Sequence, residues 1–462
     1  MDNTVKDGSS DDMIDIRIEE SLVRESLMKI DASNIRDDVL LLSLFLGIII
    51  FSFILGCTNL QEYNNENPSQ PIVANNVINY QKSDLTRRNR FVSFFLYLDR
   101  EEVKDDVRAE VNLTYEAMCF SDNSLIHKSN KQFNNLNLYS AQGYTSTYPF
   151  NFYFDQIIDY NRISLDIRLI TDPEINFENV TISVYYGDEI NTVISTLIKF
   201  TFSVIHFILL IKTISKLRTT TIRYWHLEQK LTIPLIFISI FYNNPFELIQ
   251  IVSPSYAFLI YNCIIKSIFS AYFEFFILAL FDSLRFKNRK IKACFFTPKI
   301  IFILFLFFIS LVHRIYITIT SFDTSPALDQ DKSESVFRII DLILYLLYYV
   351  WFMVSVILAG FQVDITERYK FNVYFTTCFA SLMLLGIVYC LNLFAFFENK
   401  TLGFFVPLTT INLFVILMFC FHYPYEVLDG RYNSNDNGSN DRPGKEQNDA
   451  FVDTNAQIVT IN

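Results

Sequence analysis

Charged residues are scarce in this chain of 462 residues: Asp, Glu, Lys and Arg make up only 19% of it, against 51% for hydrophobic residues. Globular domains carry about 25% charged residues, so this composition is low for a soluble protein. The net charge of −11 comes mainly from the two termini and from the segment at 58–192. An acidic balance of this kind gives no reason to expect a nucleic-acid partner.

The motifs of common enzyme and metal sites are also missing from the sequence. No glycine-rich phosphate loop follows a strand pattern, and neither a His-Glu-x-x-His nor a paired Cys-x-x-Cys motif occurs. The five histidines are dispersed, and the seven cysteines lack the spacing of a disulfide scaffold, although a single Cys57–Cys119 bridge stays open. We therefore expect no cofactor, no bound metal and no enzymatic activity.

Long apolar stretches dominate what is present. One lies near the N-terminus and seven more follow residue 192 almost end to end. A bilayer core about 30 Å thick needs about 20 apolar residues per helix, and backbone amides in hydrocarbon must bond within their own segment. The pattern predicts an α-helical bundle of one plus seven transmembrane helices, at 38–57, 193–214, 231–251, 256–281, 299–320, 337–361, 371–396 and 401–421.

Basic residues alternate between the predicted loops. The loops after the second, fourth and sixth helices contain Lys212, Lys216, Arg218, Arg223, Lys230, Arg285, Lys287, Arg289, Lys290, Lys292, Lys299, Arg368 and Lys370. The loop at 243–255 contains none, and the loop at 322–336 contains only Lys332. Because basic loops stay in the cytosol, both tails, 1–37 and 422–462, are predicted to be cytosolic.

The segment at 58–192, on the luminal or extracellular side, has a different pattern. Apolar and polar residues alternate at 91–98, 107–120, 150–158, 163–170 and 180–186, which predicts strands separated by Asn, Asp, Pro and Gly. Five or more strands over this length favour an all-β sandwich between the first two helices. The Asn-rich part at 58–83 is predicted to be a loose stalk. Asn112 and Asn179 each begin an Asn-x-Thr triplet, so we expect glycosylation there.

Two short motifs carry a family resemblance. The cytosolic elbow reads Trp225-His226-Leu227, followed by Glu228-Gln229-Lys230, and the third helix ends in Tyr242-Asn243-Asn244-Pro245-Phe246. Together with Pro298-Lys299 and Pro424-Tyr425-Glu426, these motifs and the one-plus-seven layout resemble the transmembrane protein 181 family over roughly 200–426. Asn244 replaces an Asp of that family, which puts in doubt any role that needs a carboxylate there.

The resemblance implies membership of the wider group that includes Wntless and the Golgi-dynamics-domain (GOLD) seven-helix proteins. Members of that group carry a β-sandwich ahead of the bundle, and several act in the secretory traffic of cargo. Wntless itself holds a lipid-modified ligand between its helices. We therefore expect a trafficking or cargo receptor in Golgi, endosomal or plasma membrane. A G-protein-coupled-receptor-like signalling receptor is the alternative, and an ion channel is a less favoured one.

Ionisable residues inside the predicted spans mark the candidate site. Lys266 and Glu274, His313 and Arg314, and Asp341 lie in the fourth, fifth and sixth helices. Such residues are costly in a bilayer, so they usually face a cavity or a partner. One interpretation is a polar pocket for a lipid headgroup or for the polar end of a lipidated cargo. The other is a structural Arg314–Asp341 ion pair, with Lys266 reaching toward the membrane surface.

The motif residues and the C-terminal tail allow two interpretations each. Pro245 breaks the third helix, so 243–246 either forms a re-entrant turn or, as we favour, ends the helix at the membrane surface. Glu228-Gln229-Lys230 is interpreted as an interfacial anchor, with a site for a cytosolic partner as the alternative. Tyr425 and Leu428 fit a tyrosine-based sorting signal that a cytosolic adaptor would bind.

Overall fold

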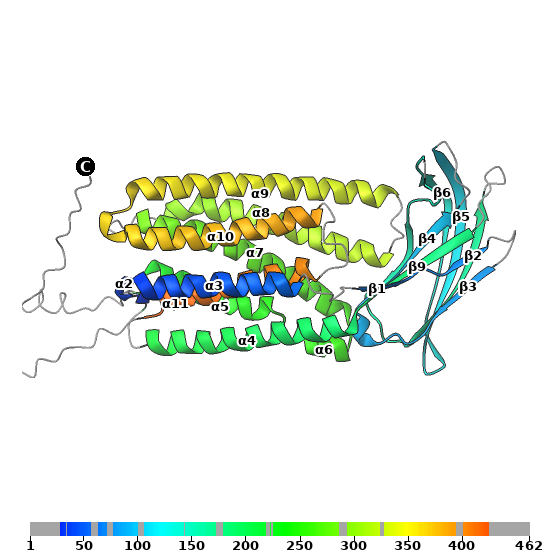
Figure 1. Ribbon diagram of the computed structural model, residues 1–462, viewed down its shortest axis with the longest axis horizontal. Coiled ribbons are helices and arrows are strands. Elements are labelled where there is room, and N and C mark those ends of the chain that lie inside the picture. The colour runs from blue at the N-terminus through cyan, green and yellow to red at the C-terminus, as the bar shows by residue number, and fades with distance from the viewer. Residues whose placement is uncertain are drawn as a thin grey trace, which may run out of the picture. The chain divides into compact units, whose positions relative to one another are not determined.

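The computed structural model describes residues 28–33, 35–56, 63–71, 77–99, 106–142, 144–171, 179–218, 222, 225–285, 293–323, 328–393 and 401–424. Its helices and strands are drawn in Figure 1. Within these residues, eight helices are long and apolar enough to cross a bilayer. A β-domain lies between the first and the second of them, so the predicted architecture is confirmed.

The helices follow the predicted spans closely. The first is α3 (Ile35–Gly56), preceded by the short α2 (Lys29–Ala32). After the β-domain come α4 (Glu189–Leu217), α5 (Leu227–Tyr242), the short α6 (Glu247–Val252), α7 (Tyr256–Arg285), α8 (Ala293–Asp323), α9 (Leu328–Gln362), α10 (Arg368–Leu393) with the 3-10 turn η3 (Ile365–Glu367) before it, and α11 (Leu402–His422). α8 and α9 extend beyond the predicted apolar runs, since a helix need not end where hydrocarbon ends.

Helix α7 forms the centre of the bundle. It packs against α5, α8, α9 and α10, and its side chains Phe269, Phe276 and Phe281 are almost completely buried. α11 packs against α3, α5 and α10. By contrast, α8 exposes large apolar side chains such as Phe305 and Phe308. A helix that is apolar on its outer face belongs in lipid rather than in water.

The β-domain is a sandwich of two antiparallel sheets. One sheet has the order β1-β9-β4-β7, with β2 also paired to β9, and the other has the order β3-β8-β5-β6. The strands are β1 (Tyr63–Glu66), β2 (Ser69–Pro71), β3 (Val77–Lys82), β4 (Val92–Asp99), β5 (Val107–Ser121), β6 (Ser124–Ser140), β7 (Phe150–Asp155), β8 (Arg162–Thr171) and β9 (Asn179–Gly187). Inward-facing side chains of both sheets share one buried core.

Sequence alternation and turn chemistry explain this sandwich. In β8, Ile163, Leu165 and Ile167 are fully buried, while the residues between them lie on the other face. Strands β5 and β6 are joined by Asp122 and Asn123, which have φ values of 47° and 72°. Two successive residues with positive φ match the twist of a tight hairpin, and Asp and Asn tolerate this backbone conformation.

One expectation about the sandwich is wrong, and one further strand was not predicted. Residues 63–71 and 77–82 form β1, β2 and β3 rather than a loose stalk, and residues 124–140 form β6, which was not predicted. β6 is an edge strand paired only with β5, and its first half is mostly exposed. An edge strand with few buried positions needs little alternation of apolar and polar residues. The Asn-, Lys- and Ser-rich sequence of β6 therefore does not predict a strand.

Cys119 in β5 is a free, buried thiol, so the Cys57–Cys119 bridge is not formed. Its sulfur lies 3.7 Å from the Tyr153 hydroxyl. Burial raises the pKa of the Cys119 thiol to about 11, because a thiolate loses its hydration in the core. Cys57 lies outside the described residues.

A tight junction connects the sandwich to the bundle. A Cβ added at Gly187, the last residue of β9, would lie 2.0 Å from the backbone oxygen of Asn89 in the 3-10 turn η1 (Arg87–Asn89). The Asn89 side chain donates to the Gly187 carbonyl at 2.9 Å. Asp188 then caps α4 by accepting the Asn191 amide at 2.8 Å. Only glycine allows β9 to approach η1 this closely.

Candidate ligand cavity in the helix bundle

A cavity of about 510 Å³ lies among α4, α5, α7, α8, α9, α10 and α11. Pockets that hold one small ligand typically measure about 300–1,000 Å³. Most lining residues come from the N-terminal parts of α4, α7 and α11 and from the C-terminal parts of α5, α8 and α10, and others come from the middle of α9. Since successive helices run in opposite directions, these parts meet at one end of the bundle, where the sandwich joins α4.

Most of the cavity wall is apolar. The aliphatic and aromatic lining residues are Phe269, Phe273, Leu342, Leu346, Leu382, Leu385, Val388, Phe404, Pro407, Leu408 and Ile411. Five tyrosines, Tyr242, Tyr345, Tyr348, Tyr349 and Tyr389, line it as well. Such a wall suits a hydrocarbon chain, and its few polar groups would orient the ligand.

The polar part of the wall includes Lys199, Lys266, Arg314 and Glu274. An ionisable side chain near the bilayer centre costs about 2.5–3.5 kcal/mol or more. Lys266 is an exposed side chain inside this wall, and no carboxylate among the described residues pairs with it. Arg314 donates to the Ser310 hydroxyl at 3.3 Å and also has no carboxylate partner in the described part of the chain. These charges mark the cavity as a functional candidate.

The five predicted pocket residues separate into two groups. Lys266, Glu274 and Arg314 line the cavity, whereas His313 and Asp341 do not. The His313 ring nitrogen Nδ1 lies 2.5 Å from an Asp341 carboxylate oxygen. Asp341 borders an adjoining crevice of about 10 Å³, which shares Ser270, Glu274 and Tyr345 with the cavity wall. The ion pair expected between Arg314 and Asp341 is therefore wrong, because Asp341 pairs with His313 instead.

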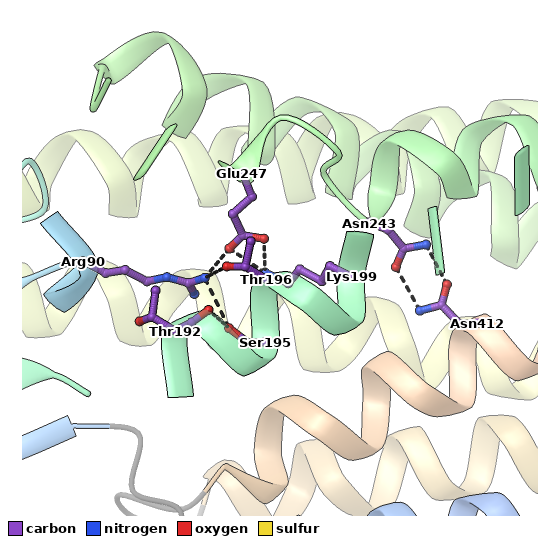
Figure 2. Close-up of polar contacts among 8 residues, drawn as sticks. All are labelled: Arg90, Thr192, Ser195, Thr196, Lys199, Asn243, Glu247 and Asn412. Carbon is purple, nitrogen blue, oxygen red and sulfur yellow. Dashed lines mark hydrogen bonds and ion pairs between the residues drawn. The ribbon is translucent and has the colours of Figure 1, made fainter. Parts of the chain in front are cut away.

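A chain of charged side chains joins the sandwich to the cavity wall. Arg90, between η1 and β4, pairs with Glu247 at the start of α6, and Glu247 pairs with Lys199 at 3.0 Å. Arg90 also donates to the hydroxyls of Ser195 and Thr196 at 3.3 and 2.9 Å, as Figure 2 shows. The sequence analysis missed this link. Lys199 and Glu247 lie inside predicted spans, so the rule that found Lys266 applies to them too.

The third span is a broken helix at the cavity. α5 ends at Tyr242, the chain turns through 243–246, and α6 completes the same candidate span. Asn243 and Asn412 exchange side-chain amide hydrogen bonds of 2.7 and 2.9 Å (Figure 2). α5 ends at this motif, as expected, and the short α6 follows the turn; the placement of the motif at the membrane surface stays a prediction. Irregular backbone inside a span is tolerated where it is buried in protein or lines a cavity.

The other residues of this motif pack at the same break. The Tyr242 ring stacks on Phe269 with 4.2 Å between centroids, and Phe246 packs edge-on against Tyr261. Asn244 lines the cavity with a φ of 47°. Its side chain is buried, and neither amide atom has a hydrogen-bond partner among the described residues.

The elbow motif lies at the opposite end of the bundle. Glu228 and Gln229 are buried, while Lys230 is half-buried. Glu228 accepts a hydrogen bond from Ser283 at 3.0 Å, and Gln229 donates to the backbone of His422 at 3.3 Å. Glu228 and Gln229 therefore connect helices at this end of the bundle, and the interpretation of the motif as an interfacial anchor stays a prediction.

The remaining predicted sites are placed as follows. Asn112 lies in β5, where its side chain accepts the Asn135 amide at 2.8 Å, and Asn179 is the first residue of β9. Tyr425 and Leu428 of the sorting signal lie outside the described residues. Within the described chain, no group of three or more His, Cys, Asp or Glu residues could hold a metal ion.

Comparison with known proteins adds one match. A family model described as Wntless-like, transmembrane domain, matches residues 192–426, which is just over half of the chain. The matched region begins within the first turn of α4 and includes every helix that lines the cavity. A comparison with curated proteins finds no match.

Proposed function

The chain belongs to the Wntless-like transmembrane family, and we propose that it is a trafficking or cargo receptor of the secretory pathway whose cavity holds a lipid or a lipid-modified ligand. It is an integral, multi-pass membrane protein. The observation that carries the proposal is the cavity, because a long apolar wall with charged groups at one side matches an amphiphile. We propose a binding role without catalysis.

The proposed orientation places both termini in the cytosol and the sandwich in the lumen or outside the cell. The alternation of Lys and Arg between loops supports it. In this orientation, the cavity opens in the luminal half of the bundle, and the sandwich is placed to engage a luminal protein or lipidated cargo. Tyr425 and Leu428 would be available to a cytosolic adaptor in Golgi, endosomal or plasma membrane.

A cavity-filling substitution tests whether a lipid binds there. Gly386 lines the cavity, and a Cβ at this position would lie 3.0 Å from the Tyr349 hydroxyl. Gly386→Leu should therefore occupy part of the cavity and reduce labelling by a photoactivatable fatty-acyl lipid several-fold. Labelling of purified full-length protein is measured by mass spectrometry of the α7 and α10 peptides.

Gly47→Leu is the matched control, because Gly47 in α3 has no atom within 4 Å of an added Cβ. This variant should be labelled like the unmodified protein. Equal labelling of the Gly386→Leu variant and the unmodified protein in the cavity peptides would reject the proposed lipid site.

The link between the sandwich and the cavity favours a signalling receptor as the second candidate. Glu247 contacts both Arg90 of the sandwich and Lys199 of the cavity wall, so a ligand at either place could alter the other. Ligand-dependent nucleotide exchange on a G protein would favour signalling. Retention of secreted proteins in the ER or Golgi after loss of the gene would favour trafficking.

A further inference from the structure

We propose that the cavity selects amphiphiles with a negatively charged headgroup, a carboxylate or a phosphate monoester, over neutral amphiphiles with the same chain. This inference rests on the proposed lipid-binding function and adds the chemistry of the headgroup.

Two cations of the wall have no carboxylate in direct ion-pair contact among the described residues. Lys266 and Arg314 both line the cavity, and neither pairs with a carboxylate in the described part of the chain. Lys199 and Arg314 act on Lys266 as like charges. Glu247, already paired with Arg90 and Lys199, acts on Lys266 more weakly as an opposite charge. Like charges around a space with low dielectric constant are unfavourable unless an anion lies between them. A ligand anion in this position would be held by both side chains.

The two carboxylates nearby do not fill this role. Glu247 is engaged by Arg90 and Lys199, and it is not part of the cavity wall. Glu274 lies eight residues beyond Lys266 on α7, about 12 Å along the helix axis. It accepts a hydrogen bond from Ser270 at 3.2 Å. Positive charge therefore remains in excess at the Lys266 side of the cavity.

Asn244 supplies a second, independent observation at the same place. Its side chain is only 4% exposed and lines the cavity, and both amide atoms lack a partner among the described residues. Buried polar groups are normally hydrogen-bonded, so an unpartnered amide in a cavity wall indicates a missing ligand or water atom. Its side-chain NH₂ group can donate to a headgroup oxygen of a ligand in this cavity.

The apolar wall continues from this polar cluster. Leu385 of α10 and Phe404 and Leu408 of α11 line the same cavity. A ligand with its anion at Lys266 and Arg314 can place its chain against this surface. A free anion would leave this surface without a partner, and a neutral amphiphile would leave the two cations uncompensated. An anionic amphiphile satisfies both parts of the wall.

Native mass spectrometry of the full-length protein in detergent tests the proposal. Oleate and oleoyl lysophosphatidate are titrated against monoolein, which has the same chain and a neutral headgroup, and inorganic phosphate is added as a competitor. The anionic amphiphiles should bind about tenfold or more tightly than monoolein, because hydrogen bonds between charged groups are the stronger ones. Phosphate alone should not displace them.

Three variants assign the selectivity to residues. Lys266→Gln and Arg314→Gln should each reduce the preference for the anion, and Asn244→Gly should weaken headgroup binding while keeping the left-handed backbone. Lys212→Gln is the matched control, because Lys212 is an exposed lysine of α4 outside the cavity. The comparison of ligands in the unmodified protein needs no variant, so it tests headgroup selectivity even if one variant fails to fold.

Each outcome decides a different part of the proposal. Equal binding of anionic and neutral amphiphiles overturns the headgroup assignment and leaves the lipid-binding function intact. If phosphate alone displaces the anionic amphiphiles, the site binds a free anion, and the proposal of an amphiphilic ligand is overturned. If the preference for anionic amphiphiles persists in both Lys266→Gln and Arg314→Gln, these two residues do not cause the selectivity. Absence of any amphiphile from the unmodified protein overturns the lipid-binding function itself.

Discussion

At the scale of single residues, the charges within this bundle are of two kinds. Some are paired: Asp282 with Lys299 and Arg285, and Lys370 with Asp31 at 2.6 Å. These pairs connect helices or the N-terminal segment at the end of the bundle away from the cavity. Lys266 and Arg314 lack such partners in the described part of the chain and line the cavity. We assign the paired charges to structure and the unpaired ones to ligand binding.

Glu66 gives a pH-dependent prediction for the sandwich. Its carboxylate accepts hydrogen bonds from Lys82 at 2.5 Å and from Tyr186 at 3.0 Å. The hydrogen bond from Lys82 lowers the pKa of Glu66 below its usual value of 4.5, although partial burial opposes the shift. A lowered pKa means that the folded state holds this proton less tightly than the unfolded state does.

The stabilisation by Glu66 is therefore present above pH 4.5 and is lost as the pH falls through the lowered pKa. In the Glu66→Gln variant, stability should depend less on pH between about 6 and 3. The difference should stay below about 1 kcal/mol, because the Glu66 side chain is 43% exposed and screened by solvent. Hydrogen exchange of the β1, β3 and β9 peptides at several pH values measures the local stability of the sandwich. If the unmodified protein and the Glu66→Gln variant gave identical pH profiles, Glu66 would not be the source of the pH dependence.

The candidate site could be predicted only in part at this scale. Lys266, Glu274 and Arg314 stood out because an ionisable residue in an apolar run is visible in the sequence alone. Arg90 did not, because it reaches Glu247 across 157 positions and nothing in its neighbourhood predicts that contact. His313 and Asp341 carried the same signal as Lys266 but pair with each other, and sequence cannot distinguish a paired charge from an unpaired one.

At the scale of elements, the junction of η1, β9 and α4 determines how the sandwich meets the bundle. Arg90 follows η1 directly, and its contacts to Glu247, Ser195 and Thr196 depend on the position of this turn. Gly187 allows the close approach on which that position depends.

Gly187→Ala should therefore destabilise the junction. Its Cβ would lie 2.0 Å from a backbone atom, so η1 or β9 has to move. Overpacking of this kind costs about 1–3 kcal/mol. Thermal unfolding of the full-length protein should show a lower Tm, together with faster hydrogen exchange at 86–92.

Gly47→Ala in α3 is the control for this prediction. Its added Cβ meets no atom within 4 Å, and alanine favours a helix over glycine, so Tm should stay equal or rise slightly. An unchanged Tm in Gly187→Ala would show that the junction is not as tight as described.

Elements with strong periodicity were predicted well, and those that depend on partners were not. The eight helices and strands β4, β5, β7, β8 and β9 carry apolar patterns of their own. The missed strands β1, β2, β3 and β6 each pair with a single neighbouring strand, and this pairing orders segments whose side chains do not indicate a strand. β7 also has a single neighbour but carries an apolar pattern, so it was predicted. The break between α5 and α6 likewise depends on Asn412, which lies 169 positions from Asn243.

At the scale of the whole molecule, the account depends on which side of the membrane the sandwich occupies. The proposed orientation predicts that Asn112 and Asn179 are glycosylated. Asn112→Gln and Asn179→Gln should each remove one glycosidase-sensitive step in gel mobility, and the double variant should lose both. Thr114→Ala and Thr181→Ala, which destroy the same triplets without changing Asn, should give the same shifts. An unmodified protein with no shift in any variant would contradict the orientation.

A cryo-EM map of the full-length protein in lipid nanodiscs would show whether the bundle holds a lipid. We expect elongated density in the cavity, with one end beside Lys266 and Arg314 and the remainder along α10 and α11. The same map of the Gly386→Leu variant should show this density weakened or lost. A cavity closed by side chains, or filled only by separate water-sized peaks, would contradict the claim that this bundle holds a lipid.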